Sequence, residues 1–485
     1  MSSDIISYPL ISYPGPADYA ALLPAFVVAL APLPILFVDL FARGNATARR
    51  AVAVGIAIVC LLAAGWLEYL QYPHDYSAFG GAFIQGGFSI VFSEIVIIAT
   101  IATLMLSLGV GRTDQVAGTT SLVLWSATGA MLMAGASNLM TVFLGLELLS
   151  LALYCLCAIS ARQTAREAAL KYLILSSVAS GFLLYGSALL FGATGSVAFA
   201  ALAIAPVTPL LALGAGLFLV GLAFKLSLVP FHVWTPDVYE GAPLPVTAFM
   251  SVVTKAGTLA VLARFAYAAL PAERASALLV PLWVIVALSM LVGNLGALAQ
   301  TDMKRLLAYS GIAQVGYIVA AFAGQTAYGL RYALLYLAGY TFMNLGAFAV
   351  VALMSKDGDA VVGIGRFAGL AHRRPWLAAA MTFFLIGLAG LPPTIGFTGK
   401  ILILAADVGA GYAWLAGVLI LGTAISAYVY FKIVRAMFVR VDLAHVRDER
   451  STNVLPWIAV GVCAAATFVL GIVPLTPSNV LPLVK

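Results

Sequence analysis

Residues 221–243 read GLAFKLSLVPFHVWTPDVYEGAP, a stretch in which an apolar helix carries Lys225 and is then interrupted at Pro230. Proline lacks the backbone N–H and its ring clashes with the preceding turn, so a helix does not continue regularly through it. The residues before the break belong to an apolar span at 209–230 that is long enough to cross a bilayer. In a membrane such a break survives only where protein or water satisfies the freed carbonyls, so we expect it to face the interior.

A second interrupted helix occurs at residues 390–400, GLPPTIGFTGK, where Pro392 and Pro393 come before Lys400. Interrupted helices in corresponding positions of two halves are typical of transporters built from inverted repeats, with the site near the membrane midplane. We therefore predict two inverted five-helix repeats. Because direct identity between the two halves is weak, this prediction rests on the helix count and on the two breaks.

The whole chain has the composition of a membrane protein. Of its 485 residues, 63% are hydrophobic and 9% are charged, whereas a soluble domain carries about 25% charged residues. Windows of about 20 residues predict fourteen apolar spans, at 20–42, 51–69, 88–109, 117–136, 138–159, 168–192, 209–230, 244–269, 276–298, 305–323, 328–354, 375–404, 411–437 and 454–475. The predicted fold is an all-α polytopic membrane protein with about fourteen transmembrane helices, of which helices 7 and 12 are broken.

These spans divide into four predicted domains. Residues 1–116 hold three N-terminal transmembrane helices, and residues 117–269 hold the first repeat with helices 4–8. Residues 270–437 hold the second repeat with helices 9–13, and residues 438–485 hold the last helix.

Lysine and arginine are distributed unevenly among the loops. Loops after odd-numbered spans hold 15 of these residues, whereas the even-numbered loops and the C-terminus hold only Arg274 and Lys485. The positive-inside rule places the cation-rich loops in the cytoplasm, so both termini are predicted on the other side. This distribution accounts for the net charge of +6 without a nucleic-acid partner.

Four ionisable side chains lie near the middle of long apolar stretches: Glu147, Lys225, Lys255 and Lys400. A charge at the centre of a membrane helix costs roughly 2.5–3.5 kcal/mol on insertion scales. Such groups are kept when they pair, face a wet cavity or perform a function. The structural alternative, a static buried ion pair, rarely repays its desolvation, so we favour a functional role for all four.

The chemistry of these groups suits proton transfer. A buried ammonium group binds its proton less tightly than an exposed one, and a nearby carboxylate restores the binding. Glu147 and Lys225, on neighbouring helices of the first repeat, are therefore the expected switching pair. Lys255 is the expected central relay, and Lys400 is the expected terminal site in the second repeat.

Other polar residues have weaker signals. Lys171 and His232 are candidate accessory relay residues, with surface ion pairing and loop hydrogen bonding as the structural alternatives. Glu94 lies outside both repeats and either pairs structurally or serves a separate path. Residues that could hold water between the lysines are Tyr172, Thr254, Ser310, Gln314, Tyr317, Tyr340 and Asn344. No His or Cys spacing indicates a metal site.

The stretch 221–243 resembles the signature of the antiporter-like subunits of respiratory complex I. The N-type subunits in particular are similar to this chain in the motif WTPDVY at 234–239. The motif is followed by PVTAF at 245–249 and by Thr254 and Lys255. The resemblance covers most of the chain and weakens before about residue 90 and after about residue 440.

Two related subunit types differ from this sequence. The M-type carries a glutamate at the position of Lys400. The L-type has a lysine there but adds a long C-terminal amphipathic helix. Because this sequence ends ten residues after its fourteenth predicted span, we expect no such helix.

The resemblance implies an ion pair between Glu147 and Lys225, a central Lys255 and an exit-side Lys400. It implies proton pumping that is driven by quinone reduction elsewhere in the complex. No cofactor is expected in this chain, and NADH, FMN, iron–sulfur clusters and quinone are expected in partner subunits. The expected partners are M-, L-, K- and J-type membrane subunits and membrane lipids. The expected location is the cell inner membrane, multi-pass, with both termini on the periplasmic side.

Other functions stay open from the sequence. A subunit of a multi-subunit Na⁺/H⁺ antiporter or of a membrane-bound hydrogenase would have the same fold. A structural subunit that only anchors its neighbours would keep the same charges as static interface pairs. A substrate permease is less favoured, because no span shows a convergent polar pocket beyond the line of lysines.

Overall fold

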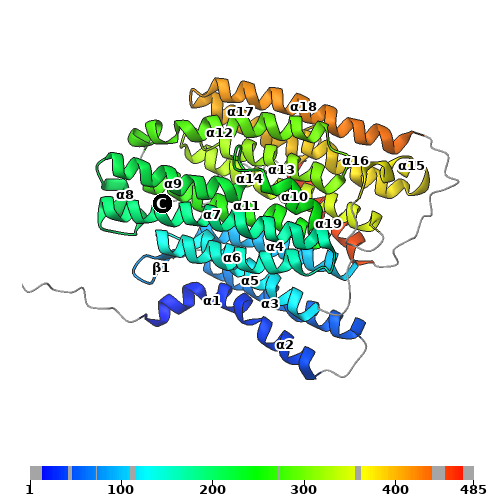
Figure 1. Ribbon diagram of the computed structural model, residues 1–485, viewed down its shortest axis with the longest axis horizontal. Helices are drawn as coiled ribbons and strands as arrows, with labels where there is room; N and C mark the ends of the chain where they lie inside the picture. The colour runs from blue at the N-terminus through cyan, green and yellow to red at the C-terminus, as the bar shows by residue number, and fades with distance from the viewer. Residues whose placement is uncertain are drawn as a thin grey trace, which may run out of the picture.

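The computed structural model describes residues 14–41, 46–72, 74–109, 116–270, 272–355, 362–439 and 454–472. These residues form a bundle of helices whose long members lie side by side with nearly parallel axes (Figure 1). In chain order the elements are α1 (Pro16–Leu30), α2 (Pro32–Phe41), α3 (Ala46–Gln71), β1 (Tyr76–Ala78), β2 (Phe83–Gln85), α4 (Gly87–Gly109), α5 (Val116–Gly135), α6 (Leu139–Ala158), α7 (Gln163–Thr194), α8 (Phe199–Ile204), α9 (Pro209–Leu226), α10 (Trp234–Gly241), α11 (Leu244–Arg264), η2 (Phe265–Ala269), α12 (Ala272–Leu298), α13 (Met303–Ala320), α14 (Ala327–Met354), η3 (Ile364–Phe367), α15 (Leu370–Arg373), α16 (Pro375–Ala389), α17 (Ile395–Gly409), α18 (Ala413–Phe438) and α19 (Leu455–Ile472).

The prediction of an all-α polytopic membrane protein is confirmed. Within the described ranges, twelve helices are long and apolar enough to cross a membrane. The fourteen predicted spans differ from these twelve at two places. The tenth span corresponds to α13, which carries Lys304, Arg305 and Gln314 and is not among the twelve, and the twelfth is divided into the shorter helices α16 and α17. The count of fourteen crossings and the two inverted repeats stay predictions.

Both predicted interruptions are present. The turn between α9 and α10 begins at Ser227, which takes a left-handed φ of 62°. The turn between α16 and α17 begins at Gly390, with a φ of 83°. A left-handed residue ends a helix because the N–H groups at the turn can then bond back to carbonyls of the last turn. The N–H of Gly390 bonds in this way to the carbonyl oxygens of Ile386 and Gly387.

A two-stranded hairpin connects α3 and α4. Strands β1 and β2 pair antiparallel, with Tyr76 opposite Gln85 and Ala78 opposite Phe83. Strands of three residues carry too short an alternation to be predicted from sequence, and the hairpin was absent from the predicted elements.

The helix α11 lies at the centre of the bundle. Every one of its residues is buried, and it packs against α4, α5, α9 and α14. The peripheral helices α3, α7, α18 and α19 instead leave most of their spans unburied. Since α11 carries Lys255, this lysine lies in the core of the protein.

Helices α7 and α9 approach each other closely because both carry glycine where they meet. A Cβ atom on Gly186 would lie 2.5 Å from the backbone nitrogen of Phe218, and one on Gly214 would lie 2.9 Å from that of Leu190. No larger residue fits at either position without a shift of the backbone. This approach holds Tyr172 of α7 against the end of α9.

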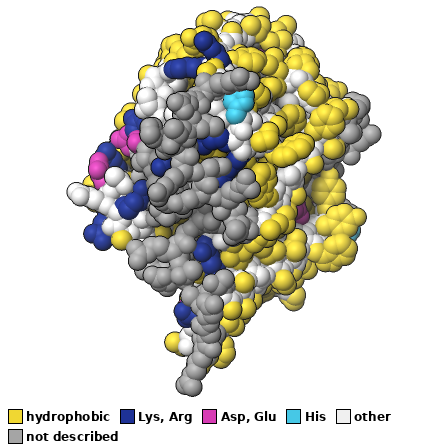
Figure 2. All heavy atoms as spheres, turned by 90° about the vertical axis from the view of Figure 1, so that its right-hand side faces the viewer, with side chains coloured by type: hydrophobic (Ala, Val, Ile, Leu, Met, Phe, Trp, Pro, Cys, Tyr) yellow, Lys and Arg dark blue, Asp and Glu magenta, His cyan; other side chains and the backbone are white. Residues whose placement is uncertain are grey.

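One end of the bundle carries many cationic side chains. Figure 2 shows this end, which is on the right-hand side of Figure 1, with lysine and arginine in dark blue. Two contacts there join loops to neighbouring helices. Lys304 Nζ bonds the carbonyl of Ala242 at 2.9 Å, and Arg374 Nη1 bonds that of Leu353 at 3.1 Å.

Several loop cations used to predict the orientation lie outside the described residues, namely Arg43, Arg112, Lys356, Arg440, Arg447, Arg450 and Lys485, as does the side chain of Arg274. The two chain ends, residues 1–13 and 473–485, also lie outside. The assignment of the cationic end to the cytoplasm therefore stays a prediction.

Candidate functional site

Lys225 lies in the last turn of α9 and is 1% exposed. Its ammonium group donates two hydrogen bonds, to Ser150 Oγ of α6 at 2.7 Å and to the hydroxyl of Tyr172 of α7 at 2.8 Å. Both acceptors are neutral. A buried charge is costly unless it is hydrogen-bonded, and here three helices converge to supply those bonds.

Glu147 lies on α6, one turn before Ser150, on the same partly exposed stripe as Leu144. Its carboxylate accepts a hydrogen bond from Ser180 Oγ of α7. The carboxylate is near enough to act electrostatically on Lys225. No ion pair between the two is found in the described part of the chain. The expected pair therefore shares one neighbourhood, while each group bonds to hydroxyls.

Lys255 lies in the middle of α11 and is 1% exposed. Its Nζ donates to Ser227 Oγ at 3.0 Å, and Ser227 Oγ accepts a second bond from Thr235 Oγ1 at 2.7 Å. Nζ also lies 5.4 Å from the ring centroid of Trp234 and 5.7 Å from that of Tyr239. Both distances lie within the range of cation–π attraction. The break after α9 thus provides the polar and aromatic contacts of the central lysine.

Trp234 connects the surroundings of the two lysines. Its indole stacks on the ring of Tyr172, with centroids 4.7 Å apart and planes inclined by 13°. Its Nε1 donates to the carbonyl of Phe224 at 3.0 Å, which fixes the ring against the end of α9. Lys225, Tyr172, Trp234 and Lys255 therefore form a continuous series of contacts.

Lys400 lies in α17 and is 4% exposed. Its ammonium group donates to the carbonyl oxygens of Leu388 at 3.0 Å and Ala389 at 3.1 Å, in the last turn of α16. The last carbonyls of a helix have no partner within the helix, so they are free to accept these bonds. Nζ also lies 4.7 Å from the ring centroid of Tyr317. The second break thus holds Lys400 as the first holds Lys255.

A row of polar side chains on α14 lies between the central and the terminal lysine. Its members are four residues apart, a spacing that places them on one helix face, and are Tyr336, Tyr340 and Asn344. Asn344 Nδ2 donates to Ser251 Oγ at 2.6 Å, and Ser251 lies one turn before Lys255 on α11.

The other end of this row reaches the terminal lysine. The hydroxyl of Tyr336 donates to Gln314 Oε1. Gln314 Nε2 donates at 3.0 Å to the carbonyl of Leu388, which also accepts from Lys400. The polar contacts therefore extend from α11 through α14 and α13 to α17.

Lys171 has a different environment from the four central groups. Its side chain is 44% exposed and pairs with Glu167 at 2.8 Å and with Asp237 at 3.1 Å. Asp237 and Glu240 pair in turn with Arg305, at 2.6 Å and 3.0 Å. Burial raises the pKa of Asp237, but the hydrogen bonds from Arg305 and Lys171 outweigh this and hold the pKa below its usual value. An accessory relay role for Lys171 stays a prediction.

His232 lies in the turn between α9 and α10 and is half-buried. Its Nδ1 is buried and has no hydrogen-bond partner among the described residues. Burial lowers the pKa of His232. The accessory relay role of His232 stays a prediction.

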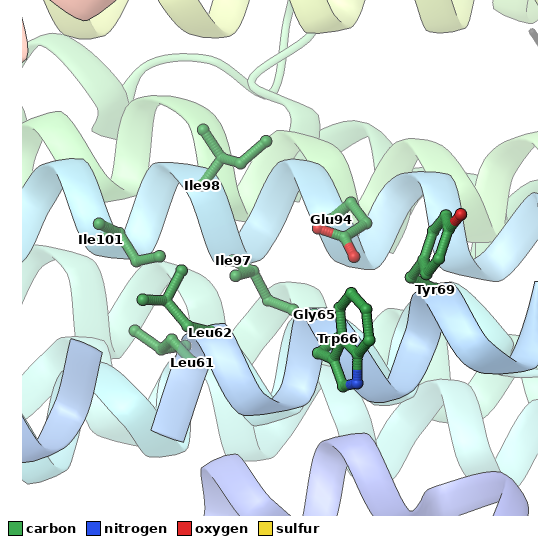
Figure 3. Close-up of a pocket in the computed structure, with 9 residues that line it drawn as sticks. All are labelled: Leu61, Leu62, Gly65, Trp66, Tyr69, Glu94, Ile97, Ile98 and Ile101. Atoms are coloured by element: carbon green, nitrogen blue, oxygen red, sulfur yellow. The ribbon is translucent and has the colours of Figure 1, made fainter. Parts of the chain in front are cut away.

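Glu94 lies apart from the line of lysines. It lines an apolar groove of about 380 Å³ between α3 and α4. Figure 3 shows Glu94 with Trp66 and Tyr69 at one end of the groove and aliphatic side chains at the other. Glu68 on α3 is 1% exposed and interacts electrostatically with Glu94. No hydrogen bond in the described ranges joins either carboxylate to the lysines.

Sequence reasoning did not identify Ser150 and Ser227, which hold Lys225 and Lys255. A single serine in an apolar helix carries no signal, and its role follows only from the fold. Asp407 was also missed. It lies seven residues after Lys400, a spacing that places both on one helix face and could have identified it.

The arrangement can hold and move protons. Lys225, Lys255 and Glu147 each hydrogen-bond to hydroxyl groups, which both donate and accept hydrogen bonds, whereas Lys400 bonds to backbone carbonyls. Within the described ranges, no group of three or more His, Cys, Asp or Glu could hold a metal ion.

Comparisons with known proteins identify the family of the chain. Residues 136–426 match the family described as NADH:quinone oxidoreductase/Mrp antiporter, TM. The chain is 40% identical over 481 residues to the NADH-quinone oxidoreductase subunit N 1 of Symbiobacterium thermophilum, across 95% of this chain and 97% of that protein.

Solved structures show the same similarity. A chain of respiratory complex I from Thermus thermophilus with bound aureothin matches with a TM-score of 0.82 and 34% identity, over 94% of this chain and 99% of that chain. A chain of the Mrp complex from Dietzia sp. matches with a TM-score of 0.79 and 21% identity, over 93% and 94% of the two chains. The latter likeness shows a shared fold alone.

Proposed function

This chain belongs to the NADH:quinone oxidoreductase/Mrp antiporter family, and from that premise we propose that it is a proton-translocating N-type membrane subunit of an NADH–quinone oxidoreductase. The observation that carries the proposal is the environment of Lys225, which is buried between two neutral hydroxyls. Hydroxyls accept from an ammonium and donate to a neutral amine. Lys225 can therefore lose its proton and stay hydrogen-bonded, which a lysine locked in a static ion pair cannot do as readily.

The first step of the proposed path is a switch between Glu147 and Lys225. When the Glu147 carboxylate lies close to Lys225, it favours the charged ammonium form of the lysine. When the carboxylate moves away, Lys225 releases its proton more readily. Ser180, which now donates a hydrogen bond to Glu147, lies on α7. A small shift of α6 against α7 would therefore change the distance between Glu147 and Lys225.

The second step is transfer from Lys225 to Lys255. The two ammonium groups act on each other electrostatically, and like charges disfavour each other. A proton that arrives at Lys225 therefore weakens the hold of Lys255 on its own proton. Transfer onward to Lys400 would use the polar side chains of α14 and Gln314.

The energy for transport would come from partner subunits. NADH, FMN, iron–sulfur clusters and quinone would be bound there, and quinone reduction would drive the switch at Glu147. The proposed neighbours are M-, L-, K- and J-type membrane subunits together with lipids. Exposed apolar side chains on α7, such as Leu170, Val178 and Tyr185, are available for such contacts.

We also propose the domain organisation and the orientation predicted above. Residues 117–269 and 270–437 would form the two repeats, each with one broken helix that ends at a left-handed residue. The cationic end would lie in the cytoplasm and both termini in the periplasm, in the cell inner membrane.

The proposal is tested by NADH-driven proton uptake in inverted membrane vesicles that carry Lys225→Ala. Assembly is checked on a native gel. The matched control is Lys432→Ala, which removes an exposed lysine at the end of α18. We expect loss of proton uptake in the assembled Lys225 variant and normal uptake in the control. Full uptake and full turnover in the assembled Lys225 variant would contradict the proposal.

A second function is favoured by one observation, namely that the matching family includes Mrp antiporters. In that case the chain would belong to a multi-subunit Na⁺/H⁺ antiporter or to a membrane-bound hydrogenase. Vesicles that exchange sodium for protons without NADH would support this function.

A further inference from the structure

The helix α17 carries a buried carboxylate that the proposed path does not use. Asp407 is 1% exposed. Both of its carboxylate oxygens are buried, and neither has a hydrogen-bond partner in the described part of the chain. Burial of an unpartnered carboxylate is costly, and buried polar groups without partners require a specific explanation. Asp407 therefore does not stabilise the fold through any described polar contact.

Asp407 and Lys400 lie on the same face of α17. The buried residues of the second half of this helix are Lys400, Ile403 and Asp407, whereas Ile401 and Val408 are about half-exposed. The carboxylate therefore faces the protein and not the membrane. With a rise of about 1.5 Å per residue, the two α-carbons lie roughly 10 Å apart along the helix axis.

The packing of α17 against α14 places Asp407 along the bundle. Two close approaches set the register. A Cβ atom on Gly339 would lie 2.5 Å from Ile395, and one on Gly399 would lie 2.3 Å from Tyr336. Since α14 residue numbers fall as α17 residue numbers rise, the helices are antiparallel. Asp407 therefore lies level with the first turn of α14.

The first turn of α14 lies at the end of the bundle opposite the cationic loops. Ala410, just beyond α17, lies against Gly324 in the turn before α14. The helix α18 begins beside this turn and runs to the other end, where the carbonyl of Ala436 accepts from the N–H of Gly369, close to Arg373. Asp407 thus lies between Lys400 and the end of the protein proposed to face the periplasm.

From this placement we propose that Asp407 receives the proton from Lys400 and releases it at the end of the bundle opposite the cationic loops. This inference rests on the proposed function. An N–H bond of the Lys400 ammonium breaks and an O–H bond forms on Asp407, which leaves a neutral amine and a neutral carboxylic acid. The acid then loses the proton to water beyond α17, and Lys400 is protonated again from the side of Lys255.

Burial favours this step. Transfer converts a separated ammonium and carboxylate into two neutral groups, which is favourable where charges are poorly solvated. The lysine ammonium now bonds the carbonyls of Leu388 and Ala389, on the side of the break. Because the lysine stem is flexible, its amino group can turn toward the other end of α17 and reduce the gap to Asp407.

Four variants in inverted vesicles test the proposal: Asp407→Asn, Asp407→Leu, Asp407→Glu and Lys400→Ala. The readout is the ratio of NADH-driven proton uptake to NADH oxidation, with assembly checked on a native gel. We expect Asp407→Asn and Asp407→Leu to lower this ratio at least twofold and Asp407→Glu to keep it near the wild-type value. Glutamate carries a proton but changes the packing, whereas asparagine keeps the shape without carrying a proton. If Asp407 serves packing alone, the ratio of proton uptake to NADH oxidation should instead be higher in Asp407→Asn than in Asp407→Glu.

The matched control is Glu68→Gln, which removes another buried carboxylate, on α3, a helix that carries no residue of the proposed path. It is expected to keep the wild-type ratio. If Lys400→Ala lowers the ratio while assembled Asp407→Asn does not, the role of Asp407 is refuted and the proposed function stands. If Lys400→Ala and Lys225→Ala both keep the full ratio, the proposed function itself is refuted.

Discussion

The indole of Trp234 stacks on the phenol ring of Tyr172, with centroids 4.7 Å apart and planes inclined by 13°. Tyr172 holds Lys225 through its hydroxyl, and the ring of Trp234 faces Lys255. The stack thus joins a residue of α7 to the first residue of α10, across the first break. It couples the positions of two lysines that share no direct hydrogen bond.

Replacement of Trp234 by leucine should loosen this coupling. Aromatic pairs are worth about 0.5–1.5 kcal/mol beyond the area that they bury, and the bond from Nε1 to Phe224 is also lost. We expect a lower thermal midpoint of the purified complex and reduced NADH-driven proton uptake. Trp414→Leu, at a half-exposed position on α18, is the control and should change neither. An unchanged uptake in an assembled Trp234→Leu complex would show that the stack does not matter for transport.

Removal of one hydroxyl isolates the contribution of Tyr172. Tyr172→Phe keeps the ring stack but deletes the 2.8 Å bond to Lys225. Hydrogen bonds to charged groups contribute about 1.5–3 kcal/mol, so we expect proton uptake to fall about tenfold, which corresponds to about 1.4 kcal/mol. Tyr185→Phe, at an exposed position on the same helix, should keep normal uptake. Equal rates in the two variants would contradict the role of this hydroxyl.

Gly390→Ala should disturb the second break. The backbone φ of 83° is in the left-handed region, and a Cβ atom would lie 2.7 Å from Lys400 Cδ. A left-handed conformation costs roughly 1–2 kcal/mol for a residue with a side chain. We therefore expect both lower thermal stability and lower proton uptake. Gly417→Ala in α18, where a Cβ atom meets nothing within 4 Å, is the control. A Gly390→Ala complex as stable as this control would refute the argument.

His232 should make stability depend on pH. Because burial lowers its pKa in the folded protein, the unfolded chain binds a proton more readily, at its ordinary pKa of about 6.5. The contribution of His232 to the free energy of unfolding is therefore fully present above about pH 6.5. It is lost as the pH falls from there toward the lowered pKa of the folded protein.

We expect His232→Gln to reduce the drop in thermal midpoint that the wild-type complex shows between pH 7.5 and pH 5.5, values chosen to bracket the ordinary histidine pKa of about 6.5. His372→Gln, at an exposed position on α15, should keep the drop of the wild type. If both variants behave alike, burial of His232 does not contribute to this pH dependence.

The helical architecture and the two breaks were predictable because they depend on strong local signals. Long apolar stretches leave few alternatives to membrane helices, and the prolines at 230, 392 and 393 mark the two places where they are interrupted. The burial of Lys225, Lys255 and Lys400 followed from the cost of charge in lipid.

The partners of these lysines were not predictable, because they come from residues far apart in sequence. Ser150 is separated from Lys225 by 75 positions, and the carbonyls that hold Lys400 become available only because α16 ends at Ala389. The partial exposure of Glu147 also depends on which side of α6 the neighbouring helices cover.

The complete enclosure of α11 is reached only after later helices have been synthesised. Its neighbour α14 is synthesised after it, so a nascent α11 leaves the ribosome before its binding place is complete. Until α14 arrives, the earlier helices α4, α5, α6, α9 and α10 shield α11 from lipid on their sides alone. A chain that stops after α11 would display a lysine-bearing helix in the bilayer, and such a fragment should be retained by the insertion machinery or degraded by membrane proteases.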